Sequence, residues 1–190
     1  MFKDLVASNR SYRRFYEEHV ISYEQLAQLV DYGRLSASGA NRQPLKYMLA
    51  WEKEKNEVIF PCLLWAGYLK EWSGPVEGER PSAYIVILQD KNIGASGVDH
   101  GIAAQSILLG AREMELGGCI IQSIQRDELR EAMHISDQYE ILLVLALGKP
   151  KEVVVIDEIE DGEDIKYWRD ENQVHHVPKR KLKDIILKWK

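Results

Sequence analysis

The chain has 190 residues, 45% of which are hydrophobic, and its formal net charge at pH 7 is -5. This apolar fraction is enough for the core of one domain, so we expect a single domain over residues 1–190. The acidic balance argues against a protein that binds nucleic acid through a basic face.

The two cysteines, Cys62 and Cys119, offer neither a disulfide framework nor the ligand spacing of a metal site. We therefore expect a reducing compartment, the cytoplasm, and predict no metal site. The N-terminus lacks the apolar run of a signal peptide, and no stretch approaches the roughly 18 apolar residues of a membrane span. No contact with a membrane is expected.

The first half of the chain predicts a mixture of helices, strands and loops. Ser22 begins the clearest helix, because Gln25 follows it in the pattern of a capping box. Two further helices are expected at residues 2–8 and 58–69, strands at 46–52 and 83–88, and loops at 36–47 and 72–82.

The second half continues this alternation, which indicates the α/β or α+β class. Residues 98–116 predict the longest helix, ended by Gly117-Gly118 and apolar on nearly every side, as in a core or between subunits. The remaining expected elements are strands at 119–124 and 140–147, a helix at 127–133, an acidic loop at 157–164 and a basic amphipathic helix at 179–190. Residues 152–178 lack a compact pattern, and we expect an arm that lies on a second subunit.

A cationic segment near the N-terminus is the first candidate binding site. Arg10, Ser11, Arg13 and Arg14 stand together in a chain that is acidic overall. Guanidinium groups bind phosphate through paired hydrogen bonds, and a serine hydroxyl can add another. The alternative is an ordinary basic turn in solvent.

The second candidate is the loop SASGANRQPLKY, residues 36–47. Ser38, Asn41 and Gln43 supply directed donors and acceptors, and the small residues between them would let a flat ligand approach the backbone. An ordinary turn between a helix and a strand would also favour Ser, Asn, Gly and Pro, so that alternative stays open.

Three other signals are less specific. Asp99 could cap the long helix, and the neighbouring His100 is expected at a helix end or an interface. Cys119 stands in an apolar strand and is expected to be a buried structural thiol. The cations at 179–181 indicate either a charged helix surface or a second contribution to an anion site.

The motifs follow one another in a specific order. An R-S-x-R-x-F segment precedes an S-x-x-N-x-Q-P loop, and D-x-G-x-A-x-Q follows on the long helix, before its L-G-G end. A strand that ends L-G-K-P and a C-terminal P-K-R-x-L complete the set. This order resembles the nitroreductase family of flavin mononucleotide (FMN) enzymes, over about residues 6–186.

The resemblance implies an α+β fold, with a central antiparallel-rich sheet flanked by helices, in a swapped homodimer with two FMN sites at its interface. Arg10 and Ser11 would bind the flavin phosphate, and Arg13 would lie near the N1/O2 edge of the ring. Many members have two arginines before the serine, where this chain has Asn9-Arg10.

The resemblance also implies the remaining contacts with the flavin. Ser38, Asn41 and Gln43 of the partner would line the ring and the ribityl chain. Ile121 and Gln122 match a segment whose backbone approaches the isoalloxazine ring. Either Lys179 or Arg180 matches a cation on the phosphate side.

The implied activity is transfer of hydride from NAD(P)H, through the flavin, to an electron-poor small molecule such as a nitroaromatic or a quinone. No catalytic side chain is expected beyond an electrostatic role for Arg13. The aromatic residues Trp65, Tyr68 and Trp72 would form either a lid over the site or part of the core. Alternative functions are a flavin store or sensor without turnover, and an interaction module with a basic C-terminal helix.

Overall fold

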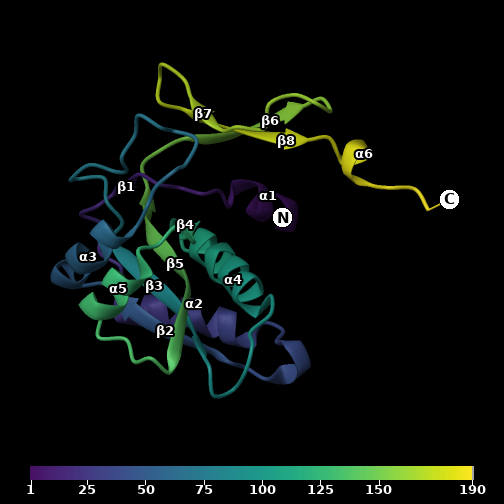
Figure 1. Cartoon of the computed structure of the whole chain (residues 1–190). Helices are drawn as coiled ribbons and strands as arrows, with labels where there is room; N and C mark the ends of the chain where they lie inside the picture. Colours follow the sequence, from purple (N-terminus) through teal and green to yellow (C-terminus); the bar gives the residue numbers. More distant parts are fainter. Residues whose placement is uncertain (190) are drawn as a thin grey trace.

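The computed structural model describes residues 1–189 and contains a five-stranded antiparallel sheet with helices on both faces (Figure 1). The strand order is β1-β5-β3-β2, and β4 also pairs with β5. The strands are β1 (Phe15–Tyr16), β2 (Leu45–Ala50), β3 (Ala83–Asp90), β4 (Gly117–Ile121) and β5 (Tyr139–Pro150). This mixture of helices with an antiparallel sheet confirms the expected α+β class.

Two helical layers enclose the sheet. One apolar cluster joins β3 and β5 to α2 and α4, and the other joins the same strands to α3 and α5. Strands β3 and β5 are buried on both faces for most of their length, which explains their unbroken apolar sequences. The helices of the body are α1 (Phe2–Ser8), α2 (Tyr23–Leu35), α3 (Lys53–Ile59), α4 (Asp99–Glu113) and α5 (Arg126–Ala132).

The predicted capping box is present at the start of α2. The Ser22 hydroxyl accepts the Gln25 backbone N–H at 3.3 Å, and the Gln25 side chain accepts the Ser22 backbone N–H at 2.9 Å. The expected helix at 2–8 and the strands near 46–52 and 83–88 are also confirmed, with ends that differ by at most a few residues.

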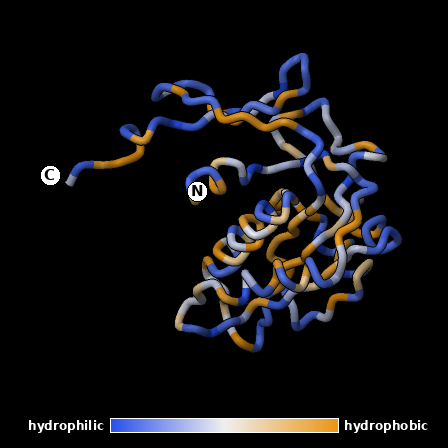
Figure 2. Tube along the Cα trace, turned by 180° about the vertical axis from the view of Figure 1, so that it is seen from behind, coloured by the Kyte–Doolittle hydropathy of each residue, from blue (hydrophilic) through white to orange (hydrophobic). Residues whose placement is uncertain are grey.

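The expected arm forms a small sheet of its own. Strand β8 (His175–Arg180) pairs in parallel with β6 (Val154–Ile159) and antiparallel with β7 (Trp168–Arg169). This sheet lies apart from the body, and the chain continues beyond it through α6 (Leu182–Ile185) into a tail that extends away from the body (Figures 1 and 2). Strand β6 occupies the first part of the expected acidic loop at 157–164.

The helix expected at 58–69 is wrong. Helix α3 begins at Lys53 and ends at Ile59, and a single 3₁₀ turn, Phe60–Cys62, follows. Pro61 has no amide hydrogen with which to continue the helix. Ala66 then adopts a left-handed conformation with φ 37°, and the chain remains irregular up to β3.

The basic helix expected at 179–190 is also wrong over the described residues. Lys179 and Arg180 belong to β8, where they pair with Glu158 and Ile159 of β6. Only Leu182–Ile185 is helical after that point, and residue 190 lies outside the described residues. Strand pairing in the arm therefore replaces the first turn of the expected helix.

The glycine pair after the long helix has a different role from the expected one. Helix α4 ends at Glu113, and Glu115 makes the left-handed turn with φ 58°. Gly117 and Gly118 lie in β4, where neighbouring atoms occupy the space of a side chain. A Cβ on Gly118 would lie 2.6 Å from the Ala146 carbonyl oxygen and 2.8 Å from Leu108.

We predict that Gly118→Ala lowers the free energy of unfolding by about 2 kcal/mol or more, because the added methyl group meets backbone that cannot move aside. Gly67→Ala is a matched control, since nothing lies within 4 Å of its Cβ position. It should change stability by less than about 1 kcal/mol. Urea denaturation measures both, and equal stabilities of the two variants would contradict the packing argument.

Candidate functional site

A cavity of about 310 Å³ brings the cationic N-terminal segment together with the arm. Three cations line it, Arg10, Arg13 and Lys179, and Ser11 adds a hydroxyl group. The other lining residues are Asn9, Gln105, Leu108, Ile120, Tyr167, His175 and Val177. Within residues 1–189 no acidic side chain lines this cavity, so its field favours an anion.

The N-terminal segment is fixed by backbone contacts with β4. Ser11 forms an isolated parallel bridge with Gly118, and the Tyr12 backbone N–H donates to the Gly118 carbonyl at 3.1 Å. Arg10 donates from Nη2 to the Val6 carbonyl at 2.9 Å, but its buried Nε has no hydrogen-bond partner among residues 1–189. That N–H is therefore free to donate a hydrogen bond to a ligand.

The buried carboxylate of Glu152 ties the same segment to the arm. Its Oε1 accepts the backbone N–H of Arg13, and its Oε2 accepts from Arg169 Nη2 at 3.0 Å. The Glu152 side chain has no exposed surface, and Arg169 is 9% exposed and lies over the Trp72 ring at 4.2 Å. The ion pair is therefore shielded from water and from salt.

Three groups hold the Arg13 guanidinium. It lies 4.9 Å from the centre of the Tyr167 ring, and Nη1 is 3.3 Å from both the Ser11 carbonyl oxygen and His175 Nε2. An arginine N–H can only donate, so His175 Nε2 must accept. Burial, together with the Arg13 and Arg169 charges, lowers the pKa of His175 to about 4, so the ring is neutral at pH 7.

Alternation along β8 separates the two C-terminal cations. Lys179 lines the cavity, whereas Arg180 is exposed and does not. Successive strand residues point to opposite faces, so only one of the two can point toward the cavity. Of these two residues, Lys179 is therefore the cation that lies at the cavity.

The Ser38 loop lies at a second cavity, of about 210 Å³. Ser38 and Gln43 line it together with Asp99 and Tyr47, while Asn41 is exposed and does not line it. Asp99 was expected to cap α4, but its carboxylate instead accepts from the Ser38 hydroxyl at 2.7 Å and from the Gly39 backbone N–H at 3.0 Å. The two groups of predicted residues are therefore not together within one chain.

The strand after α4, β4, lines the first cavity with a different residue from the two that were predicted. Ile121 is 5% exposed and packs in the core with α3 and α5, whereas Ile120 is 39% exposed and lines the first cavity. Gln122 is exposed and lines neither cavity. The backbone of β4 still borders the cavity, through Ile120.

The remaining expectations have mixed outcomes. Cys119 is a buried thiol as expected, and burial raises its pKa although Arg13 lies close enough to lower it. Trp65 packs against the core, and Trp72 lies under Arg169. Tyr68 is the most exposed of the three aromatic residues, at 49%, and its ring lies 5.0 Å from that of Tyr167.

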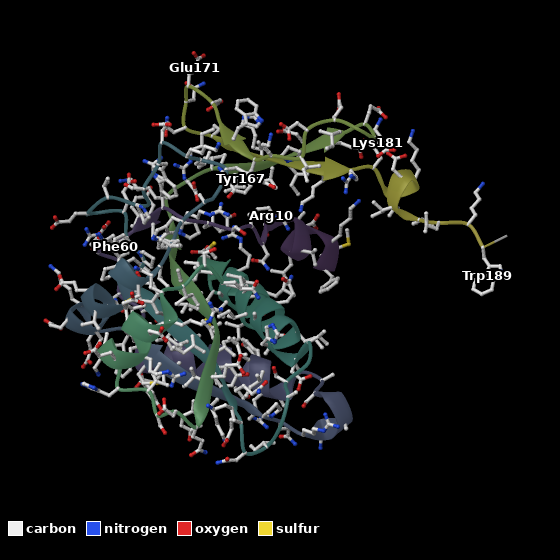
Figure 3. All side chains as sticks on the ribbon, viewed as in Figure 1. Arg10, Phe60, Tyr167, Glu171, Lys181 and Trp189 are labelled. Carbon is white, nitrogen blue, oxygen red and sulfur yellow. The ribbon has the colours of Figure 1, made fainter. Side chains whose placement is uncertain are left out.

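Four residues of this site were not predicted from the sequence: Glu152, Tyr167, Arg169 and His175. All four lie in the segment 152–178, which lacks a regular pattern. Only the pair His175-His176 is visible in the sequence of this segment, because the burial of Glu152 follows from the fold. Figure 3 shows Arg10 and Tyr167 close together between the arm and the body.

Comparison with known proteins identifies relatives of the fold. The model of the nitroreductase family matches residues 61–149. The expected resemblance to the nitroreductase family is confirmed. No curated protein matches the chain significantly.

Solved structures share the nitroreductase fold. An FMN-dependent nitroreductase from Clostridium difficile has a TM-score of 0.64 at 23% identity, with 78% of this chain and 87% of that chain covered. A nitroreductase family protein from Clostridium novyi has a TM-score of 0.67 at 20% identity, with coverage of 80% and 86%. A protein from Parabacteroides distasonis, provisionally described as an NADH dehydrogenase/NAD(P)H nitroreductase, has a TM-score of 0.63 at 20% identity, with coverage of 79% and 87%.

A second ion cluster holds the N-terminal segment from its other side. Glu79 accepts from Arg14 Nε at 2.5 Å and Nη2 at 2.7 Å, and Lys151 Nζ lies 3.0 Å from Glu79 Oε1. These hydrogen bonds, first that of Arg14, lower the pKa of Glu79 to about 2. The Arg13 backbone N–H and the Arg14 side chain thus donate to two separate carboxylates.

The depressed pKa of Glu79 predicts a dependence of stability on pH. Its contribution is fully present above about pH 4.5, the ordinary value, and is lost as the pH falls toward about 2. Glu79→Gln should lower the free energy of unfolding by about 2 to 3 kcal/mol at pH 7. The difference from the wild type should shrink between pH 4.5 and 3 in urea denaturation, and a constant difference would contradict the assignment. Glu71→Gln, at an exposed position, should change stability by less than about 0.5 kcal/mol.

The Glu152 pair gives a second prediction. Glu152→Gln leaves the Arg169 charge buried without its counterion and should lower the free energy of unfolding by about 3 kcal/mol. The double variant Glu152→Gln with Arg169→Met removes the unpaired charge and should recover part of that loss. Urea denaturation of both single variants and the double variant gives the coupling energy. Additive effects would show that the two side chains do not interact.

Proposed function

We propose that the protein is an FMN-dependent oxidoreductase that transfers hydride from NAD(P)H to an electron-poor small molecule, such as a nitroaromatic or a quinone. The observation that carries the proposal is the convergence of Arg10, Ser11, Arg13 and Lys179 on one cavity without an acidic residue among residues 1–189. The likeness to solved structures, one of them an FMN-dependent nitroreductase, supports the choice of cofactor.

The residues of the cavity fit a flavin phosphate. Phosphate oxygens need several donors and positive charge, and Arg10, Ser11 and Lys179 supply both. Arg10 Nε and His175 Nδ1 are buried N atoms without a partner among residues 1–189. Because His175 Nε2 accepts from Arg13, the neutral ring carries its proton on Nδ1. This N–H is a second donor that is free to bind a ligand.

Flavin, when bound, supplies the hydride chemistry, and the protein supplies position and charge. We assign Arg13 to the N1/O2 edge of the ring, where its fixed charge favours the negative charge that develops on reduction. A cation in a partly dry site contributes on the order of a few kcal/mol to such a charge. The contacts of Arg13 with Tyr167 and His175 hold it in place before the ligand arrives.

Two neighbouring groups do not compete with this role. His175 is neutral at pH 7 because its pKa is about 4, so it adds no charge beside Arg13. Cys119 stays protonated because burial raises its pKa, so it does not act as a thiolate. The positive charge beside the ring would then come from Arg13 alone.

A second copy of the chain would complete the site. Helix α4 borders both cavities, through Gln105 at the first and Asp99 at the second. A copy packed along α4 would bring its Ser38, Asn41 and Gln43 toward the first cavity. Exposed apolar residues on this side support such packing: Phe2, Leu35, Val98 and Ile102.

The tail supports the same assembly. Leu187 and Trp189 are 91% and 101% exposed, and the tail extends away from its own body (Figures 2 and 3). Burial of such side chains is favourable by roughly 25 cal/mol per Å², so they would contribute to binding against a partner. The arm itself lines the cavity of its own chain through Tyr167, His175 and Lys179. In this proposal only the tail and the Ser38 loop cross to the second copy.

The test begins with the purified protein and FMN. We expect FMN to remain bound through gel filtration at the elution volume of a dimer, and NADH or NADPH to be oxidised when a quinone is added. Arg13→Ala should retain FMN but slow its reduction in rapid-mixing absorbance by about 10- to 100-fold. Arg13→Lys keeps the charge and should lie between the two.

The outcomes separate the parts of the proposal. Failure to take up FMN would end it entirely. Bound FMN without turnover with either nicotinamide would favour a flavin store or sensor. An unchanged reduction rate in Arg13→Ala would remove only the role of Arg13, and a monomer that binds FMN fully would remove the partner's loop from the site.

A further inference from the structure

A cavity of about 490 Å³ lies away from the proposed flavin site. It is formed by the segment after β1, by α3 and by the loop before β3, and it shares no lining residue with the Arg10 cavity. Figure 3 shows Phe60, which lines it, well separated from Arg10 and Tyr167. Its volume is typical of sites for small molecules.

Unpartnered polar atoms gather at this cavity. Among residues 1–189, nine buried side-chain atoms have no hydrogen-bond partner, and three of them belong to residues that line this cavity: Asn56 Oδ1, Arg80 Nε and Ser82 Oγ. Buried polar groups normally have partners, since an unmade hydrogen bond costs about 1 to 3 kcal/mol. Such a concentration in one cavity points to a ligand that supplies the missing partners.

The internal contacts of these residues show which groups remain free. Ser82 is 8% exposed, its backbone N–H donates to the Leu147 carbonyl at 3.0 Å, and its carbonyl accepts from Asn56 Nδ2 at 2.7 Å. That contact fixes the orientation of the Asn56 amide, with its oxygen as the free acceptor. The free groups are thus an acceptor on Asn56, a donor on Arg80 and a hydroxyl on Ser82 that can serve as either.

Aromatic side chains form the walls around these groups. The Arg80 guanidinium lies over the Phe60 ring at 4.4 Å, and the Arg80 backbone N–H donates to Glu17 at 3.1 Å, which fixes the segment. Trp51 adds further ring surface, whereas Tyr84 is only 1% exposed. A flat molecule can therefore stack against the walls while its edge reaches the polar atoms.

The charges of the lining disfavour an ionic ligand. Four carboxylates line the cavity, those of Glu17, Glu18, Glu57 and Glu77, against the two cations Lys53 and Arg80, and this negative surplus repels an anion. The Arg80 charge, next to the buried polar atoms, repels a cation. A neutral ligand with adjacent donor and acceptor groups satisfies both restrictions.

We propose that this cavity binds a neutral, flat ring molecule through a carboxamide or cyclic amide edge. The ligand N–H donates to Asn56 Oδ1, and its carbonyl oxygen accepts from Arg80 Nε and Ser82 Oγ. The ring stacks between the aromatic walls. Binding here does not depend on the flavin cavity, because the two share no residue.

Benzamide and three analogues of similar size test the proposal. Protein-observed ¹H–¹⁵N NMR, with and without FMN, should show benzamide shifting the Asn56 side-chain amide and the Trp51 indole signals. Acetophenone lacks the N–H, benzoate carries a negative charge and benzylamine a positive one. Each should bind at least about 5-fold more weakly than benzamide, since one neutral hydrogen bond contributes about 1 kcal/mol.

Two serine variants provide the matched comparison. Ser82→Ala removes the free hydroxyl with little change of volume and should weaken benzamide binding about 5-fold. Ser73→Ala, at an exposed position outside the cavity, should bind benzamide like the wild type. The ¹H–¹⁵N spectrum of each variant verifies that it is folded before the titration.

Three results would overturn the proposal. Benzamide could leave the Asn56 and Trp51 signals unchanged, which would mean that solvent alone satisfies these atoms. Benzylamine could bind most tightly, which would mean that the carboxylates at the cavity bind a cation instead. Ser82→Ala could bind benzamide as well as Ser73→Ala does, which would leave stacking as the sole interaction. Failure of FMN uptake has no bearing on any of these results.

Discussion

The buried carboxylate of Glu152 is the group on which the cationic cavity depends. It accepts the backbone N–H of Arg13 and pairs with Arg169, and so joins the N-terminal segment to two positions of the arm. A buried charge is expensive unless it is paired and hydrogen-bonded, and this one meets both conditions. Its position directly after β5 fixes the start of the arm against the N-terminal segment. The cavity forms between these two elements.

The local balance of charge follows from that contact. Arg169 is paired with Glu152, and Arg14 with Glu79, so a neighbouring carboxylate offsets each of these charges. Arg10, Arg13 and Lys179 remain, and the neutral His175 lies among them without adding charge. A chain with a net charge of -5 thereby maintains a cationic site for an anion. The surplus is local, which is why composition alone could not reveal it.

The sequence predicts those parts of the fold that depend on local patterns. The capping box at Ser22 and the apolar strands β3 and β5 are visible because each pattern lies within a few consecutive residues. Failures arise where a distant contact decides the outcome. The sequence predicts that Lys179 and Arg180 begin a helix, but in the fold they belong to β8 and pair with β6. The residues of the site divide in the same way between local and distant contacts. The N-terminal motif is identifiable from consecutive residues, whereas the roles of Glu152 and His175 depend on the fold of the arm.

The backbone of the Ser38 loop is strained. Ala40, Asn41 and Gln43 have positive φ values between 51° and 53°, each of which costs about 1 kcal/mol or more in a residue with a side chain. Hydrogen bonds within the loop and with Asp99 hold this shape: the Gln43 backbone N–H donates to Ser38 Oγ at 2.9 Å, and its side chain to Asn41 Oδ1 at 3.1 Å. Residues held at such φ values cluster at ligand clamps, where the strain has a functional reason. The proposed second copy provides one, because a loop already rigid loses little entropy when it closes over a flat ligand in the neighbouring chain.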